Sequence, residues 1–527
     1  MHIEGNRPYF IIVPLTFNYI QRILFTFLLL NKRNKCLHYF ALGILLISSA
    51  PYINAQEADT ITLSYNLELE ATFSGGEHTP FWLVSNKHGL GSPKTNNGWL
   101  QGRIQKELNP EKRFSWGAGV DLAAGWNQIS PFFVKQLYGE IKYRSLYMMV
   151  GSKEIWSIYN DPSLSSGNIL YSGNALPIPQ IRVGTYDFAP FWGTNNWFWV
   201  KGYLAFGKYT DSGWQKSWAS PGSKRSSNVL YNSKGIWFRG GNKDKFPLIF
   251  DLGIEMATQF GGTVYLDNET IKMPTKFIDW IKAIFPLSGG NNTPMGEQTN
   301  VQGNMLGAYN VAISWYSPKN WEISAYYQHY FEDHSQLTYD FIWKDALWGI
   351  KVKLPENPFI STFLYEYIYT KDQSGPVNND WTPEVPEQVS GGDNYFNHYL
   401  YIGWQNWGMG IGNPLIISPI YNINHHLNFY DTRIIANHFG LEGKPICDLN
   451  WRMLYSFTQN WGTYQYPFKN VLKNFSGLIE INYKPEKLKG WYGKLGLAWD
   501  YGTLLGNSLG GMITIGKEGF FNIPLKK

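Results

Sequence analysis

The sequence predicts an all-β chain that forms a transmembrane β-barrel of the outer-membrane type, with long loops and one short amphipathic helix. Three observations lead to this fold class. Aromatic residues make up 17% of the chain while charged residues make up only 16%, against about 25% charged in an average soluble domain. Many segments alternate apolar and polar residues over the 9–11 residues that a tilted strand needs to cross a bilayer. Short turns also alternate with long irregular segments, which is the asymmetry of outer-membrane barrels.

The composition narrows the class further. The chain has 53 glycines, 23 tryptophans and 35 tyrosines, and the two aromatic types join an apolar body to a polar tip that suits a boundary with water. The mean hydropathy of −0.29 is too polar for a bundle of membrane helices, and no apolar run of 18 residues follows Gln56. A secreted β-sandwich lectin would share this composition, but sandwich strands are usually only about 5–6 residues long.

Three segments show the alternation most clearly. In 114–126, "FSWGAGVDLAAGW", the aromatic and aliphatic residues fall on one face and the small residues and Asp121 on the other. Segments 248–258 and 494–502 repeat the pattern, with Asp251 and Asp500 on the polar face. Aromatic residues near strand ends, such as Phe114 and Trp126, are typical of the girdles at the two membrane interfaces.

Weaker versions of the same pattern predict further strands at 62–73, 134–143, 145–151, 181–187, 198–207, 308–316, 321–331, 347–353, 360–369, 397–404, 451–461, 477–484 and 509–515. Short turns are predicted at 109–113, 317–320 and 484–490, and long loops at 74–100, 152–180, 208–235, 261–307, 370–396 and 405–432. Such long loops are unusual in a compact domain unless they carry function.

One segment has a helical period instead. "MPTKFIDWIKAIFP" (273–286) places apolar residues at helical spacing, with Pro274 near its start and Pro286 at its end. We expect a short amphipathic helix that packs in the lumen or caps the pore. The alternative is a helix that lies on the outer leaflet.

The N-terminal 55 residues are read as an extension and signal peptide, and residues 56–527 as the barrel with extracellular or luminal loops. "NKRNK" (31–35) is a basic region, "CLHYFALGILLISSAPYI" (36–53) is apolar, and Ala55 precedes a plausible cleavage site. An N-terminal membrane anchor is the alternative. The expected location is the outer membrane of a Gram-negative bacterium, reached through a cleaved signal peptide.

Charge and cysteine content exclude several partners and sites. The net charge is +5, but without residues 1–55 the chain has 40 basic and 39 acidic residues, so no basic patch indicates nucleic acid. The cysteines are Cys36 and Cys447, which leaves one thiol in the mature chain and no internal disulfide or cysteine-rich metal site. We expect no metal and no cofactor.

The stretch "SGGEHTPFWLVSNKHGLGS" (74–92) holds two histidines and an aromatic pair between glycines. Its histidines lack the spacing of a metal motif. A folded polar loop is one interpretation, and a saccharide contact built from His78, Trp82 and Lys87 is the other.

The stretch "YYQHYFEDHS" (326–335) contains Glu332, Asp333 and His334. Glycoside hydrolysis needs two carboxyl groups about 5–9.5 Å apart, and adjacency in sequence does not create that geometry. A strand end that turns into a polar loop is the simpler interpretation, with saccharide binding as the functional one.

The richest candidate is "NYFNHYLYIGWQNWGMGIGNP" (394–414). Aromatic rings stack on the apolar faces of sugars, and amides and imidazoles can hydrogen-bond hydroxyl groups. The candidate polysaccharide-binding residues are Tyr395, His398, Tyr401, Trp404, Gln405, Asn406 and Trp407. The alternative is an aromatic girdle in which Tyr399, Tyr401 and Trp404 face lipid headgroups. Most of the acidic residues of the preceding loop, including Asp372 and Asp393, are interpreted as solvated, and binding of a cation or of basic sugar substituents is the alternative.

Several of these stretches occur in order in a known family: 78–90, 114–122, 136–143, 151–154, 164–184, 256–265, 326–335 and 393–419. With them the chain resembles the capsule assembly protein Wzi family, in its Bacteroides-like version, from about Leu63 to Gly519. The resemblance implies an outer-membrane barrel of about 18 antiparallel strands. It also implies a surface lectin that binds capsular or exported polysaccharide and attaches it to the cell. The best-studied branch has a helical plug, which only 273–286 resembles here.

The expected function is therefore non-enzymatic, because no P-loop or dinucleotide-binding motif is present. Expected partners are capsular or exopolysaccharide, outer-membrane lipid and lipopolysaccharide, with the chain acting as a monomer. Two rivals stay open at this point: a porin-like saccharide channel and a surface enzyme that uses Glu332 or Asp333.

Overall fold

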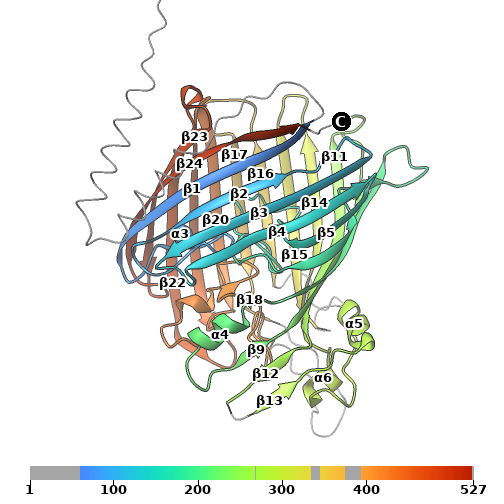
Figure 1. Cartoon of the computed structure of the whole chain (residues 1–527), viewed down its shortest axis with the longest axis vertical. Helices are drawn as coiled ribbons and strands as arrows, with labels where there is room; N and C mark the ends of the chain where they lie inside the picture. The colour runs from blue at the N-terminus through green and yellow to red at the C-terminus, as the bar shows by residue number, and fades with distance from the viewer. Residues whose placement is uncertain (1–59, 268, 334–344, 374–392, 525–527) are drawn as a thin grey trace, which may run out of the picture.

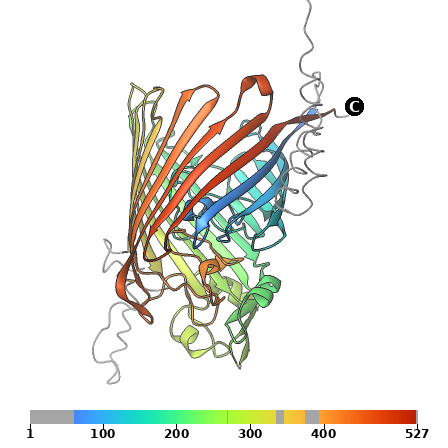
Figure 2. The same ribbon diagram turned by 90° about the vertical axis from the view of Figure 1, so that its left-hand side faces the viewer.

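The computed structural model describes residues 60–267, 269–333, 345–373 and 393–524, so the expected signal region lies outside the described residues. The chain forms a closed antiparallel β-barrel of 18 strands (Figures 1 and 2). This confirms the predicted fold class. The ring strands are β1 Thr60–Gly76, β2 Asn97–Lys106, β3 Phe114–Trp126, β4 Phe132–Tyr143, β5 Leu146–Ser152, β6 Gln180–Thr185, β8 Phe198–Lys208, β10 Leu230–Gly240, β11 Leu248–Phe260, β14 Asn304–Tyr316, β15 Glu322–Glu332, β16 Ala346–Lys353, β17 Thr362–Tyr369, β20 Ile434–Ile446, β21 Leu449–Gly462, β22 Pro467–Tyr483, β23 Trp491–Gly502 and β24 Ser508–Pro524.

The remaining elements are short and lie in connections. The helices are α3 Phe81–Val84, α4 Ser212–Trp218, α5 Phe277–Ile284, α6 Met295–Thr299, η1 Pro419–Tyr421 and η2 Glu486–Leu488. The short strands are β7 Ala189–Pro190, β9 Arg225–Ser227, β12 Thr263–Tyr265, β13 Thr270–Lys272, β18 Gln405–Asn406 and β19 Met409–Gly410. No helix among the described residues is long and apolar enough to cross a membrane.

The barrel closes by pairing its first and last strands. β1 pairs with β24 from Thr60 opposite Pro524 to Gly76 opposite Ser508. This seam leaves no unpaired sheet edge, which a lipid environment requires because it offers no hydrogen bonds to backbone groups.

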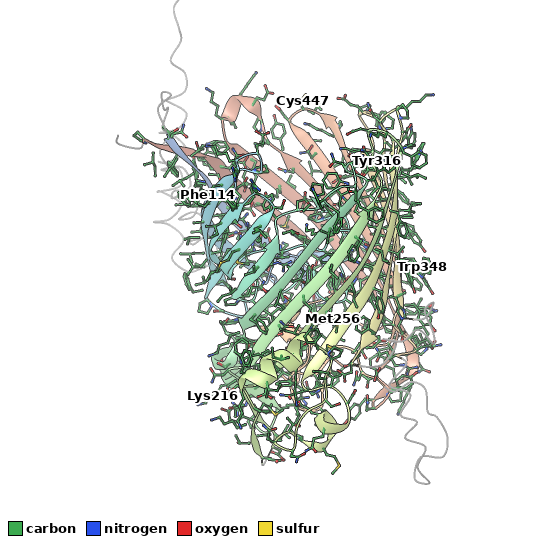
Figure 3. The ribbon with its side chains drawn as sticks, turned by 90° about the vertical axis from the view of Figure 1, so that its right-hand side faces the viewer. Phe114, Lys216, Met256, Tyr316, Trp348 and Cys447 are labelled. Atoms are coloured by element: carbon green, nitrogen blue, oxygen red, sulfur yellow. The ribbon has the colours of Figure 1, made fainter. Side chains whose placement is uncertain are left out.

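The two faces of the wall differ as the sequence predicts. On β3, Phe114 and Trp116 are 58% and 41% exposed, while Ser115 and Asp121 are buried on the luminal side. Figure 3 shows apolar side chains such as Phe114 and Trp348 on the outer wall. Apolar residues outward and polar residues inward is the alternation that a lipid-facing barrel needs.

The longest connections lie at one end of the barrel, together with the short connections β3–β4, β21–β22 and β23–β24. The predicted turns at 109–113, 317–320 and 484–490 join β2 to β3, β14 to β15 and β22 to β23. They lie at the end where β1 begins and β24 ends, and the long connections lie at the other end (Figure 1). In outer-membrane barrels the short turns are periplasmic and the longer loops extracellular; we use the terms turn end and loop end.

Three strands of the barrel were not predicted from the alternation of apolar and polar residues. β2, β10 and β20 lie within or beside segments expected to be loops. Their luminal faces include the apolar residues Trp99, Trp237 and Ile434, which are buried against other parts of the chain. An apolar luminal residue erases the contrast between faces, so the period-2 signal is lost.

The predicted strand at 397–404 is wrong. These residues have no strand structure and belong to one long connection between β17 and β20. Residues such as Tyr401 and Trp404 are 1% and 0% exposed, because the segment is folded into the barrel and packed on every side.

Inward-folded loops fill the loop half of the lumen and form a plug. We define the plug as 77–96, 153–179 and 393–432, which are connections of β1–β2, β5–β6 and β17–β20. Their apolar side chains pack in one cluster with luminal residues of the wall. Examples from the three segments are Phe81, Ile169 and Trp404, each 2% exposed or less.

Hydrogen bonds join the plug to strands around the ring. The Glu366 carboxylate on β17 accepts from Ser166 N at 2.8 Å, and His438 Nε2 on β20 lies 2.7 Å from the Leu164 carbonyl oxygen. On the other side, Phe81 N donates to Asp500 Oδ2 of β23 at 2.8 Å. Because these bonds are buried, leaving any donor unpaired is costly, and the plug is held in one position.

The helix predicted in 273–286 exists as α5, but the expected position in the lumen or over the pore is wrong. Trp280 packs on Phe206 of β8 and Phe260 of β11, at ring-centroid distances of 4.9 and 5.6 Å. Both phenylalanines point outward, because they share a strand face with the exposed residues Leu204 and Leu252. Helix α5 therefore lies against the outer wall (Figure 1).

Candidate functional site

The aromatic segment 394–414, the main candidate from the sequence, lies in the plug rather than on a surface. Tyr395, Tyr401 and Trp404 are at most 1% exposed, and so are Gln405 and Asn406. Their ring faces meet protein instead of lipid headgroups, so the girdle interpretation is wrong for Tyr401 and Trp404. Tyr399, 52% exposed, lies outside this buried group.

The polar atoms of this segment serve the plug itself. Trp404 Nε1 donates to the Leu170 carbonyl at 2.8 Å, Tyr401 OH donates to the Gly261 carbonyl at 3.2 Å, and Asn406 Nδ2 donates to the Leu176 carbonyl at 2.9 Å. These bonds join the plug segments to one another and to the loop after β11.

His398 and Trp407 are part of the same structure. His398 Nδ1 accepts from Leu400 N and Tyr401 N at 3.2 and 3.3 Å. Burial, assisted by Lys224, lowers the pKa of His398 to about 3, so the imidazole is a neutral acceptor. Trp407 has φ of 55°, and its backbone N–H donates to Asp211 Oδ2 at 3.1 Å.

The candidates from 74–92 are also internal. His78 Nδ1 lies 2.8 Å from Ser508 Oγ, and Trp82 lies in α3 at 3% exposure. Lys87 pairs with Glu70 on the luminal wall. The structure therefore separates these three residues instead of joining them in one binding surface.

The carboxylates of 326–335 lie at the loop end of β15. Glu332 is buried on the strand, and Asp333 accepts from Asn300 Nδ2 at 2.8 Å. Burial raises the pKa of Asp333. His334 lies outside the described residues. Among the residues that are described, no group of three or more His, Cys, Asp or Glu side chains is arranged to hold a metal ion.

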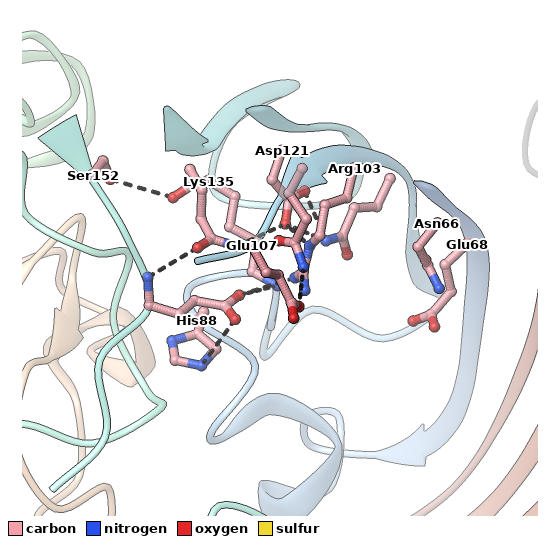
Figure 4. A network of polar contacts seen from close by, with 12 residues as sticks. Asn66, Glu68, His88, Arg103, Glu107, Asp121, Lys135 and Ser152 are labelled. Carbon is pink, nitrogen blue, oxygen red and sulfur yellow. Dashed lines mark hydrogen bonds and ion pairs between the residues drawn. The ribbon is translucent and has the colours of Figure 1, made fainter. Parts of the chain in front are cut away.

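The turn half of the lumen contains a charged cavity of about 1270 Å³. Figure 4 shows part of its wall, where Arg103 pairs with Asp121 at 2.8 Å and with Glu154 at 3.3 Å. Lys135 also reaches Glu154, at 2.9 Å. Charges of both signs alternate on this wall, so the cavity has no single-sign field that would select an anion or a cation.

A second cavity, of about 680 Å³, opens at the loop end, between the plug and the ends of β21–β24. We call it the tyrosine groove. It combines aromatic rings with side-chain amides, and the exposed Tyr466 stands at its edge with 72% exposure. Its lining residues are Ile417, Tyr421, Asn422, Tyr430, Gln465, Tyr466, Pro467, Phe468, Leu472, Leu504 and Leu505.

Local hydrogen bonds fix the plug side of the groove. The 3-10 turn η1 ends in Tyr421, and Asn422 Nδ2 donates to the carbonyls of His426 and Asn428 at 2.7 and 2.8 Å. Asn424 Nδ2 donates to Tyr430 OH at 2.7 Å. These contacts hold Tyr421 and Tyr430 in one loop conformation without a ligand, which lowers the entropic cost of binding.

The same loop carries a second aromatic pair. The rings of Trp218 and His425 stack at 4.7 Å with an interplanar angle of 5°, and His425 Nδ1 lies 3.0 Å from the Trp218 carbonyl oxygen. His425 is exposed. The loop 417–430 thus connects the tyrosine groove to a further exposed aromatic surface.

Sequence reasoning missed the tyrosine groove because its residues come from three separate connections. "TYQYPF" (463–468) has two tyrosines in the short connection after β21, and it was the available signal. Nothing in the sequence shows that this turn faces residues 417–430.

Comparison with known proteins supports the fold. No family model and no curated protein matches the chain. Among solved structures, the chain is similar to Wzi of Escherichia coli, described as an outer-membrane protein involved in group 1 capsule assembly and a carbohydrate-binding β-barrel. The identity is 12%, the match covers 88% of this chain and 85% of that chain, and the TM-score is 0.52.

Two further similar structures are OprD and OccD3 (OpdP) of Pseudomonas aeruginosa. Their identities are 9% and 8%, and their TM-scores are 0.43 and 0.42. The matches cover 88% of this chain in both cases, and 96% and 91% of the other chains. At the identity found for Wzi, the likeness concerns the fold. The chain is an outer-membrane β-barrel whose fold resembles that of Wzi.

Proposed function

We propose that this barrel is a surface lectin of the Wzi kind, which binds an exported capsular polysaccharide at its loop end and helps to assemble and attach the capsule. The tyrosine groove is the observation that carries the proposal. It is a surface cavity in which Tyr430, Tyr466 and Phe468 stand beside Asn422 and Gln465.

The chemistry of the groove suits a neutral or weakly charged sugar. Aromatic rings bury the apolar C–H faces of a pyranose, and amide groups both donate to and accept from its hydroxyls. Each contact is weak. A repeating polymer engages many protein copies at once, and such multivalency raises the overall avidity by orders of magnitude.

The similarity of this fold to a solved structure also supports the proposal. The Escherichia coli Wzi barrel is described as carbohydrate binding and as involved in group 1 capsule assembly. The ordered sequence stretches from 78–90 to 393–419 resemble the same family. Membership of that family, export through a cleaved signal peptide and a monomeric state are parts of the proposal.

A porin-like saccharide channel is the alternative, and the plug weighs against it. The described plug residues pack against one another and bond to β17, β20 and β23. Polysaccharide attachment needs no open pore. Planar-bilayer conductance of the purified protein separates the two functions, because a channel conducts ions and the plugged barrel does not.

We also propose that the site binds without catalysis. The described residues that line the tyrosine groove are tyrosines, amides and apolar residues, with no carboxylate among them. Incubation of the purified protein with polysaccharide from its own strain should leave the polymer length unchanged. Shortening of the polymer that disappears in Glu332→Gln or Asp333→Asn would establish an enzyme instead.

The direct test measures binding of purified capsular polysaccharide to the protein in detergent. Replacing both Tyr430 and Tyr466 with alanine removes two rings, and each truncation at a binding hot spot costs about 1–2 kcal/mol, or roughly 5–30-fold in affinity. Tyr483→Ala is the matched control, since Tyr483 is an exposed tyrosine at the turn end with 47% exposure. Equal affinities of the double variant and the control would contradict the assignment of polysaccharide binding to the tyrosine groove.

The test on cells uses a gene deletion. We expect the total polysaccharide to stay constant while a larger share moves from the cell surface into the medium. Expression of the parent protein or of Tyr483→Ala should restore attachment, whereas the Tyr430/Tyr466 double variant should not. An unchanged ratio of bound to free polymer in the deletion strain would contradict attachment.

A further inference from the structure

The loop between β11 and β14 folds back over the outside of the barrel. Its residues 273–303, which include α5 and α6, form what we call the collar. Beneath it, Met256, Met305 and Phe331 of the outer wall pack with Val301 of the collar in a closed apolar cluster. Three of the four are below 3% exposed and the other is at 9%.

Helix α5 is capped within its own first turn and is hydrogen-bonded to the wall at its C-terminal end. At its start, the Asp279 carboxylate accepts from Lys276 N at 2.6 Å and caps the helix. At its end, the Ala283 carbonyl accepts from Lys234 Nζ at 2.7 Å and from Thr258 Oγ1 at 3.2 Å. Lys234 and Thr258 share the outward faces of their strands with Ile236 and Leu252.

The collar therefore begins where the lipid-facing band ends. Lys234 is two residues from Ile236 on the same face of β10, and Ile236 is 40% exposed toward the membrane. Two residues of a strand span about 7 Å. The C-terminus of α5 thus lies at the height of the membrane interface on the loop side.

The side of α5 that does not touch the wall is apolar and exposed. Phe277, Ile278 and Phe285 are 82%, 54% and 56% exposed, and the following Leu287 is 47% exposed. Buried on the opposite side are Asp279 and Ala283. A rigid helix that shows two phenylalanines to water is unusual for a soluble loop, because clustered exposed apolar groups mark an interaction site.

Lysines accompany these apolar residues. Lys272 and Lys276 are exposed, and Lys282 is half-buried in the last turn of α5. Aromatic and aliphatic residues together with lysines are typical of helices that lie in the membrane interface, with their apolar side about 5–10 Å into the headgroup and acyl boundary. Because this apolar surface continues the lipid-facing band of the barrel, we expect the outer leaflet of the membrane to cover it.

We propose that the collar is a membrane-interface anchor: Phe277, Ile278 and Phe285 insert into the outer leaflet, while Lys276 and Lys282, together with Lys272 just before the collar, contact anionic lipid headgroups. The collar stays level with the leaflet and fixes the height of the barrel. This function is separate from polysaccharide binding, which is assigned to the other side of the loop end.

The test uses site-directed spin labels on the full protein with Cys36 and Cys447 replaced by serine. Single cysteines at Phe277, Phe285, Ile236 and Asn291 are labelled with a nitroxide, and the proteins are reconstituted in vesicles of phosphatidylcholine and phosphatidylglycerol. Ile236 is the lipid-facing reference, and Asn291, an exposed residue of the collar, is the aqueous reference.

We expect the labels at Phe277 and Phe285 to lose accessibility to a water-soluble nickel complex and to gain accessibility to oxygen, relative to the label at Asn291. Values equal to those at Asn291 would overturn the proposal. Spin–spin broadening that vanishes on dilution with unlabelled protein would overturn it in favour of contact between two copies. If a labelled variant fails to fold, as shown by its heat-modified gel mobility, the label at Ile278 gives the same comparison.

Discussion

Glu366 provides the sharpest test of the plug. Its carboxylate, fully buried on the luminal face of β17, accepts from Ser165 Oγ at 2.5 Å and from Ser166 N and Oγ at 2.8 and 2.5 Å. Tyr326 OH of β15 donates to it at 2.6 Å. Three of these four donors belong to the plug, so this one side chain joins the segment 153–179 to the wall.

The size of the effect of Glu366→Ala follows from these bonds. A hydrogen bond to a charged group contributes about 1.5–3 kcal/mol, and a buried donor left without a partner costs about 1–3 kcal/mol. Water that enters the vacated space recovers part of the loss, so we expect plug docking to weaken by about 3 kcal/mol for the three donors. That free energy corresponds to a rise of roughly a hundredfold in the undocked population.

Planar-bilayer recording measures this population as ion current. The parent protein should be closed, and Glu366→Ala should show frequent openings while keeping the heat-modified gel mobility of a folded barrel. Glu322→Ala is the control, because Glu322 lies on the next strand but one and pairs with Lys353, at 3.3 Å, at the turn end. A folded Glu366→Ala protein with no more current than this control would refute the argument that the tether holds the plug.

Three further predictions follow from the outer wall, the collar and the plug. Leu252→Arg places a charge on the lipid-facing side of β11 and should destabilise the folded barrel in lipid by about 2–4 kcal/mol. The measurement is the amount of folded protein in outer membranes, which should fall for Leu252→Arg and stay unchanged for the control Asp244→Arg in a turn. Burial, with Asp333 and Asp279 nearby, raises the pKa of Glu297 to about 8. Because the folded collar holds the Glu297 proton more tightly than the unfolded chain does, this group's contribution to stability is complete below pH 4.5 and is lost as the pH rises to 8. Proteolysis of the collar should therefore accelerate between pH 5 and 8.5 in the parent and show no such rise in Glu297→Gln. Trp404→Ala leaves a cavity in the plug and should destabilise it by about 3–5 kcal/mol, detected as ion current through a barrel that remains folded, and a closed barrel would show that the ring is dispensable.

The barrel was predictable because its outer surface meets lipid along every strand. The segments 114–126, 248–258 and 494–502 show their apolar face whatever lies in the lumen, and the structure has strands over each of them. β10 was missed because one residue on each of its faces departs from the expected pattern. Trp237 points into the packed lumen and Lys234 points outward beneath α5, so the expected pattern is reversed at these two positions.

The site was harder to predict, because a plug and a sugar-binding surface use the same residue types. Tyr401, Trp404 and Asn406 have the aromatic and amide groups of a lectin site, yet those groups bond to the chain itself. Whether a ring meets sugar or protein depends on which loops fold inward, and the relevant contacts, such as Trp404 with Leu170, join residues 234 positions apart. The position of α5 was unpredictable for the same reason, since Phe206 and Phe260 lie on other strands.

The seam between β1 and β24 has a consequence for the order of assembly. The plug contains 77–96, which follows β1, and it bonds to Asp500 on β23, so its partners lie on both sides of the seam. The ring cannot close before β24 is available, because β24 pairs with β1 along its whole length. Once it has closed, a loop that is still outside must enter through the open end and displace water against packed walls. Folding is therefore simplest if the inner segments pack on the sheet while it is still open, and β24 then pairs with β1 and encloses them. In that order, pairing of β1 with β24 is the step after which the plug can no longer leave the barrel.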